Sequence, residues 1–186
     1  EGKLLKKRNT FSDFISCAKF LIEKKYTSKK KLIAFGGSAG GLLIGNVINQ
    51  VPELFLGAIM AVPFLDSLTT NMDHSLPLSK GELLEFGDAK NNKEHFEYIR
   101  SYAPYDNIEK KDYPNILITT SLSDSRVLFD EPTKYCAKLR EYKTDNNLLL
   151  FKCEMDAGHG SRSGRKNIIE DIAFDYAFAL KVANKI

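Results

Sequence analysis

Three residues of reactive type lie far apart along the chain, each in a segment that suits catalysis. Ser38 lies within the glycine-rich segment GGSAGG, Asp124 follows an apolar run that ends at residue 121, and His159 has a glycine on each side. A serine hydroxyl becomes a nucleophile when a histidine removes its proton, and an aspartate can hold that histidine in the required tautomer. These residue types therefore predict acyl-transfer chemistry, provided that the fold brings them together.

The surroundings of Ser38 match the strand–turn–helix setting of a G-x-S-x-G nucleophile. Residues 31–35 predict a short buried strand, and residues 39–50 predict a helix. So tight a turn leaves no room for neighbouring side chains, which explains the glycines. The backbone N–H of Ala39, at the start of the helix, can donate to an oxyanion. Two interpretations compete: a glycine-rich turn in which Ser38 only caps the helix, and a phosphate-binding loop.

The base is chosen from three histidines. His74 lies in an irregular segment, and His95 lies in a charged helical stretch where we expect it to be solvated. His159 follows the last predicted strand in a glycine-flanked loop that can reach toward a serine, although a histidine of an exposed loop is the simpler alternative. We therefore expect His159 to be the general base.

The acid is expected at the carboxyl end of the third predicted strand. Asp124 follows that strand directly and is the candidate. Asp156 is closer to His159 in sequence, but we expect it to hold the histidine loop, and we expect Asp130 to begin a helix. The chain order Ser38, Asp124, His159 is the order found in α/β-hydrolases.

Strand-like and helix-like segments alternate along the chain, which predicts an α/β fold with a mainly parallel sheet covered by helices on both faces. We expect Asn9 or Thr10 to cap the first helix, and residues 63–112 to be irregular with short helical pieces such as 93–101. Strands are predicted at 31–35, 57–62, 115–121 and 147–153, and helices at 11–25, 39–50, 131–143 and 167–183. Active residues then belong at the carboxyl ends of the strands.

Composition excludes several classes of function. The 186 residues are 43% apolar with a net charge of +3, as in one ordinary globular domain. The basic residues at 6–8 and 29–31 are expected to be solvated, so no nucleic acid is predicted, and no apolar run is long enough to span a membrane. Cys17, Cys136 and Cys153 form no CxxC pair and lack zinc spacing, so we expect a reducing, cytoplasmic setting with no metal or cofactor.

Several segments together resemble the prolyl oligopeptidase family, and within it the oligopeptidase B subfamily. They are GGSAGG, residues 123–127, and residues 155–160 with 163–165, supported by residues 10–14, 49–55, 62–64, 101–107 and 138–141. The likeness runs in order over essentially the whole chain. It implies that residues 1–186 are the C-terminal half of an α/β-hydrolase catalytic domain, without the N-terminal β-propeller, the first sheet strands and an upstream tyrosine that supplies a second oxyanion donor.

The same resemblance implies hydrolysis of short peptides after Arg or Lys, through an acyl-enzyme on Ser38. It implies a pocket in which Phe64 stacks on the substrate's basic side chain and Glu82 pairs with it, while Arg126 anchors a backbone carbonyl. Composition alone favours a core aromatic for Phe64 and a surface acid for Glu82. The chain departs from the family at Leu84, where a second acid is expected, and at Asp130, where an aromatic residue is expected.

Two alternatives stay open at this point. The chain could be an inactive remnant, or half of a split gene that needs a separately encoded N-terminal partner, since four strands leave a sheet edge and an apolar face uncovered. It could also be a carboxylesterase-like hydrolase, because the same three residues serve ester substrates.

Overall fold

Four parallel strands form one sheet whose order, β1-β2-β3-β4, follows the sequence. The computed structural model describes residues 1–160 and 163–186. The strands are β1 (Ile33–Gly37), β2 (Gly57–Ala61), β3 (Asn115–Ser121) and β4 (Leu149–Glu154). The helices are α1 (Arg8–Glu23), α2 (Ala39–Gln50), α3 (Ser67–Met72), α4 (Ser79–Phe86), α5 (Lys93–Arg100), α6 (Asp130–Tyr142) and α7 (Arg165–Val182), with the 3-10 turns η1 (Leu4–Lys6) and η2 (Pro52–Leu54).

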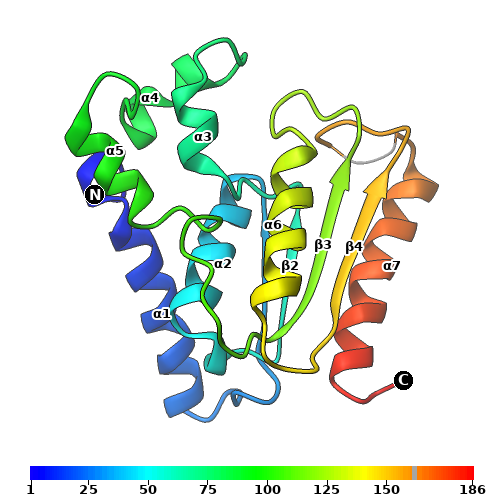
Figure 1. The fold of residues 1–186 in the computed structure, drawn as a ribbon. Coiled ribbons are helices and arrows are strands. Elements are labelled where there is room, and N and C mark those ends of the chain that lie inside the picture. The colour runs from blue at the N-terminus through cyan, green and yellow to red at the C-terminus, as the bar shows by residue number, and fades with distance from the viewer. Residues whose placement is uncertain (161–162) are drawn as a thin grey trace.

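Both faces of the sheet are covered, as the alternation of elements predicts. Side chains alternate along a strand, so Ala58 and Met60 of β2 belong to the large core that includes residues of α1, α2 and α6, while Ile59 points to the other face. There it packs with Leu117 of β3 and Phe178 of α7. Figure 1 shows α2 and α6 along the sheet and α7 beside β4. The prediction of an α/β fold with helices on both faces is confirmed.

The segment between β2 and β3 is more ordered than the sequence indicates. Besides α5, which lies within the predicted piece 93–101, it contains α3 and α4. Figure 1 shows these three helices beyond the ends to which the strands point. Since α4 is only 8 residues long and α3 only 6, neither has enough turns to display a clear 3.6-residue period.

The start of α1 corrects the predicted cap. The helix begins at Arg8 with Lys7 as the N-cap, directly after η1, and neither Asn9 nor Thr10 caps it. The Asn9 side chain instead donates to the carbonyl of Glu1, and the Thr10 hydroxyl donates to the carbonyl of Lys7. A 3-10 turn directly before a helix offers backbone carbonyl groups as acceptors for the N–H groups at the helix start. A polar capping side chain is therefore not needed.

Apolar surface remains open on the α7 side of the sheet. The outer edge of β1 has no strand beside it in the described chain, and Phe35 of that strand is 58% exposed. The outer side of α7 exposes Ile169, Ile172 and Tyr176, three residues with helical spacing. Such a surface is larger than single scattered apolar residues would produce.

None of the described helices has the length and hydropathy that a bilayer span requires.

Candidate active site

The turn that carries Ser38 is strained. Ser38 has φ 54° and ψ −121°, a conformation that non-glycine residues rarely adopt, between the end of β1 and the start of α2. Hydrogen bonds hold it there: the Ser38 N–H donates to the carbonyl of Ala61 over 2.9 Å, and the Phe64 N–H donates to the Ser38 carbonyl over 3.0 Å. The strand neighbouring β1 and the segment that follows it therefore fix the serine from both sides.

Steric crowding explains some, but not all, of the glycines. A Cβ at Gly36 would overlap the carbonyl of Gly40, and a Cβ at Gly41 would overlap Pro63. A Cβ at Gly40 would meet nothing within 4 Å. The expectation that side chains beside the serine would collide thus holds for Gly36 and Gly41 but is wrong for Gly40.

His159 connects the serine and the acid. Its Nε2 lies 3.0 Å from the Ser38 Oγ, and its Nδ1 lies 2.8 Å from the Asp124 Oδ2. Both distances are within hydrogen-bonding range. The Asp124 side chain is fully buried, whereas 17% of the His159 side chain is exposed, so the histidine has one side open to solvent. The structure brings together the three residues that the sequence singles out.

The loop after β3 aims Asp124 at the histidine. Asp124 Oδ1 accepts hydrogen bonds from the backbone N–H groups of Arg126 and Val127, at 2.9 and 3.0 Å, which leaves Oδ2 for His159. The loop is also tied to the histidine loop, because the Ser123 N–H donates to the carbonyl of Ala157 over 3.2 Å. The geometry of the acid is therefore determined by backbone hydrogen bonds rather than by the aspartate alone.

Ala39 is the first residue of α2, directly after the serine. The first four N–H groups of a helix have no acceptor within it, and the helix dipole favours negative charge there. The Ala39 N–H is thus suited to receive an oxyanion formed beside Ser38.

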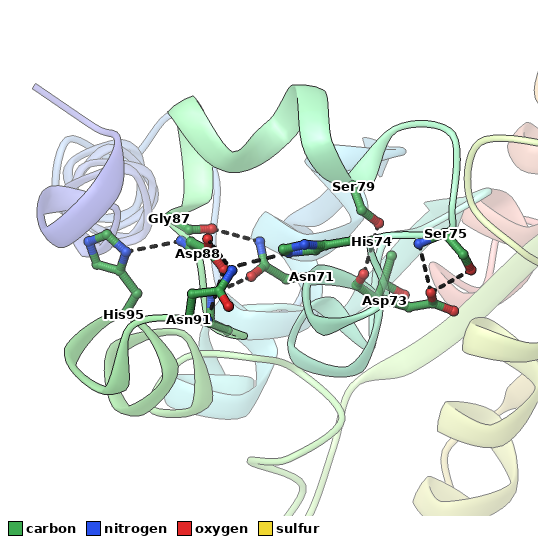
Figure 2. Close-up of polar contacts among 11 residues, drawn as sticks. Asn71, Asp73, His74, Ser75, Ser79, Gly87, Asp88, Asn91 and His95 are labelled. Carbon is green, nitrogen blue, oxygen red and sulfur yellow. Dashed lines mark hydrogen bonds and ion pairs between the residues drawn. The ribbon is translucent and has the colours of Figure 1, made fainter.

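The other acids and histidines lie elsewhere. Asp130 begins α6, as predicted. Asp156 is exposed, and its side chain makes no hydrogen bond or ion pair within the described residues, so the structure does not show it holding the histidine loop. The expectation that His95 is solvated is wrong: its ring is half-buried, and its Nδ1 accepts from the Asp88 N–H over 2.9 Å. His74 Nε2 lies 3.5 Å from Asp88 Oδ1. Figure 2 shows both histidines around the turn after α4, with His95 pointing at Asp88 from α5.

This turn anchors α4, the helix that carries Glu82. The amide of Asn71, in α3, donates to the Gly87 carbonyl and accepts from the Ala89 N–H, both over 2.8 Å (Figure 2). Asn71 is buried, so these bonds are protected from water. Glu82 itself is half-buried, and burial raises the pKa of its carboxyl group, with a smaller contribution from the nearby Glu85.

Phe64 and Arg126 occupy different environments. Phe64 is only 5% exposed and packs edge-on against Phe86 of α4, with the ring centroids 5.5 Å apart. Little of its ring face is open to a ligand while α4 holds this position. Arg126 is exposed on the loop that follows Asp124. No hydrogen bond links these side chains to the serine or the histidine in the described part of the chain.

Three buried charged residues were missed in the sequence: Lys7, Asp66 and Glu131. Asp66, 1% exposed, pairs with Lys134 of α6. Glu131, 2% exposed, accepts from the Asp66 N–H over 2.9 Å and from the Thr70 hydroxyl over 2.6 Å, and so ties α6 to the segment after Phe64. Lys7, expected to be solvated, is 9% exposed and pairs with Glu85. A charged residue in an amphipathic segment gives no sequence signal of burial, because the residues that cover it are remote in sequence.

Comparison with known proteins adds the family context. The sequence profile of the prolyl oligopeptidase family matches residues 1–185. Protease 2 of Moraxella lacunata is 52% identical over 180 residues, which are 97% of this chain and 26% of that protein. Oligopeptidase B from Leishmania major superposes with a TM-score of 0.95 at 45% identity, covering 98% of this chain and 25% of that one. Oligopeptidase B from Trypanosoma brucei, with covalently bound antipain, gives 0.95 at 46% identity, covering 98% of this chain and 26% of that one. The chain spans about a quarter of the length of these relatives.

Proposed function

The chain belongs to the prolyl oligopeptidase family of serine peptidases, and on that basis we propose that it forms the catalytic part of an oligopeptidase that cleaves short peptides after Arg or Lys. The observation that carries the proposal is the continuous hydrogen-bonded line from Asp124 through His159 to Ser38, at 2.8 and 3.0 Å. Three residues of these types, from three separate loops, have no need to meet for the sake of folding alone.

The proposed chemistry is acyl transfer. As the Ser38 Oγ bonds to the peptide carbonyl carbon, its proton passes to His159 Nε2, and Asp124 stabilises the imidazolium that forms. The tetrahedral oxyanion is received by the Ala39 N–H. When the C–N bond breaks, the same proton goes to the leaving amine. Water then attacks the acyl-enzyme, with His159 again accepting and returning a proton, and the carboxylic acid leaves Ser38 free.

We propose that the basic side chain of the substrate binds in the space between α4 and the segment after β2. Glu82 supplies the carboxylate that pairs with the substrate cation, and Phe64 supplies aromatic surface beside it. Because Phe64 is 5% exposed, this requires α4 to move away from the Phe64 ring when substrate binds. Arg126, exposed on the acid loop, is proposed to anchor a substrate carbonyl. Short basic peptides are therefore the proposed partners.

We also propose that an upstream half of the hydrolase sheet packs on this chain, in the same polypeptide or as a separate one. The unpaired edge of β1 and the apolar outer side of α7 support this. So does a hollow of about 310 Å³ behind His159, whose apolar lining includes Val62, Ile168 and Phe174. A cytoplasmic location belongs to the same proposal, since the free thiols of Cys17, Cys136 and Cys153 fit a reducing compartment.

The test is labelling by a fluorophosphonate probe. The 186-residue chain is treated alone and after mixing with the upstream part of Moraxella lacunata Protease 2, beside Ser38→Ala as the matched control. We expect labelling at Ser38 that the upstream part increases, and none in Ser38→Ala. Equal labelling of Ser38→Ala would exclude Ser38 as the nucleophile. Arginyl amides and acyl esters are then compared as substrates, and a preference for long acyl esters would indicate an esterase instead.

An inactive remnant is the second candidate, and the uncovered apolar surface favours it. One oxyanion donor from this chain leaves a second to be supplied from elsewhere, and loss of one donor lowers the rate by about 10² to 10³. If the chain aggregates, or melts without cooperativity, and the upstream part does not restore labelling, the remnant is the better description. A chain that melts cooperatively and labels on mixing argues for the peptidase.

A further inference from the structure

Lys7 is a buried cation beside the proposed specificity pocket. It is 9% exposed, its Nζ pairs with the carboxylate of Glu85, and the same nitrogen lies 4.7 Å from the centroid of the Phe86 ring. A carboxylate and an aromatic ring around an ammonium are also the surroundings that a basic substrate side chain requires. Glu85 and Phe86 are thus groups that suit a substrate cation, but Lys7 of the chain itself already occupies them.

The groups around Lys7 belong to the helix that carries Glu82. Glu85 and Phe86 follow Glu82 by three and four residues on α4, so the three side chains share one side of the helix. The Phe86 ring in turn packs edge-on against Phe64, with centroids 5.5 Å apart. Lys7 therefore reaches from the junction of η1 and α1 to the border of the pocket that Phe64 and Glu82 are proposed to form.

We infer that Lys7 is a positioning residue that sets the charge of this pocket: by pairing with Glu85 it leaves Glu82 as the carboxylate that meets the substrate, so that the pocket accepts a single basic side chain. This inference rests on the proposed role of Glu82 in binding. The carboxylates of Glu82 and Glu85 and the ammonium of Lys7 together carry one net negative charge, which one substrate cation neutralises. Without Lys7, a second carboxylate would face the substrate.

The charged groups that face Glu82 make the inference testable. Burial raises the pKa of Glu82, Glu85 raises it further, and Lys7 lowers it. Glu85 acts from α4 itself, and Lys7 acts from the η1–α1 junction. Removal of Lys7 should therefore raise the pKa of Glu82, and removal of Glu85 should lower it. Removal of both should bring it back toward its starting value.

The experiment measures this directly by carbon-13 NMR titration of the glutamate side-chain carboxyls in the 186-residue chain. The Glu82 signal is assigned by its loss in Glu82→Gln. The variants are Lys7→Met, Glu85→Gln and the two combined. The matched control is Lys6→Met, which removes a neighbouring lysine that is exposed and pairs with Glu1. We expect opposite shifts for the single variants, near-recovery in the double variant and no shift in the control.

A kinetic readout separates charge setting from a merely structural role. With the chain mixed with the upstream part of Protease 2, Lys7→Met at pH 8 should lower KM for an arginyl amide by roughly two- to fivefold, the range of a partly exposed charge pair, with kcat unchanged. If Lys7 were needed only for folding, the Lys7→Met substitution would lower kcat instead.

The inference is overturned if Lys7→Met leaves the Glu82 titration unchanged, or moves it toward lower pH, in a chain that still unfolds cooperatively. If Lys7→Met does not fold, Glu85→Gln decides alone, because an unchanged or raised pKa there contradicts the same charge balance. Failure of the proposed function looks different: Ser38 would stay unlabelled in every variant, while the Glu82 titration would still respond to Lys7.

Discussion

His159 Nε2 lies 3.0 Å from the Ser38 Oγ, although 121 positions separate the two residues in the sequence. The serine follows β1 and the histidine follows β4, the two outer strands of the sheet. Because all four strands are parallel, their carboxyl ends share one edge, and the loops that follow them can meet above it. Since β1 and β4 are separated by two strands, the contact also depends on the loops that bring the two residues together above this shared edge.

The Asp124→Asn substitution should remove most of the reactivity of Ser38. The Oδ1 of the substituted amide can still accept the N–H groups of Arg126 and Val127, so the loop should keep its shape. The new NH2 group would face His159 Nδ1 and favour the tautomer that cannot accept the serine proton. We expect fluorophosphonate labelling to slow by about 10⁴ with unchanged thermal unfolding. Asp156→Asn, a change at an exposed residue in the histidine loop, is the control and should label normally. The reverse pattern would identify Asp156 as the acid.

The two glycines after Ser38 should respond oppositely to a methyl group. Gly41→Ala places a Cβ into Pro63 and should destabilise the chain by about 1–3 kcal/mol. Gly40→Ala meets nothing within 4 Å and should stabilise it by about 0.5 kcal/mol, since alanine restricts the unfolded chain and favours the helix. Urea unfolding of both variants gives the comparison. Equal effects would mean that Pro63 does not crowd this turn.

Glu131 should make stability fall as the pH rises. Burial raises its pKa to about 7 from 4.5, so the folded chain binds the proton more tightly than the unfolded chain does. The stabilisation is complete below about pH 4.5 and is lost as the pH rises through about 7, a change of about 3 kcal/mol. Glu131→Gln keeps an acceptor for the Asp66 N–H and removes the titration.

The measurement is the free energy of unfolding in urea from pH 5 to pH 8, with Glu141→Gln on the exposed side of the same helix as the control. The difference between the unaltered chain and Glu131→Gln should change across this range, and the difference for Glu141→Gln should not. Parallel curves for all three proteins would show that Glu131 stays ionised in the fold.

Glu82 and Leu84 should change substrate preference without changing the fold. Glu82→Gln removes the proposed partner of the substrate cation and should lower kcat/KM for arginyl amides by about ten- to a hundredfold, the worth of a charge-assisted hydrogen bond. Neutral substrates should be affected much less. Leu84 is 81% exposed, so Leu84→Glu should not disturb packing, and it should lower KM for basic substrates. An equal loss for neutral and basic substrates in Glu82→Gln would remove Glu82 from the pocket.

The sequence by itself determined the elements and the reactive residues, because these depend on local patterns. The bounds of α2 and β3 match the predicted 39–50 and 115–121. The glycine pattern around Ser38 reports a sharp turn, and the glycines around His159 report a loop. Short helices such as α4 escaped detection because 8 residues give too little periodicity.

Only the tertiary structure decided which charges are buried. Lys7, Asn71 and Glu131 look like surface residues in sequence, and each is buried because residues remote in sequence close over it: Lys7 is paired with α4, Asn71 is held by the turn after α4, and Glu131 is bound by the segment after β2. The cost of burying a charge or an amide depends on the partners that it finds. Those partners come from segments that are distant in the sequence, so no local sequence pattern predicts them.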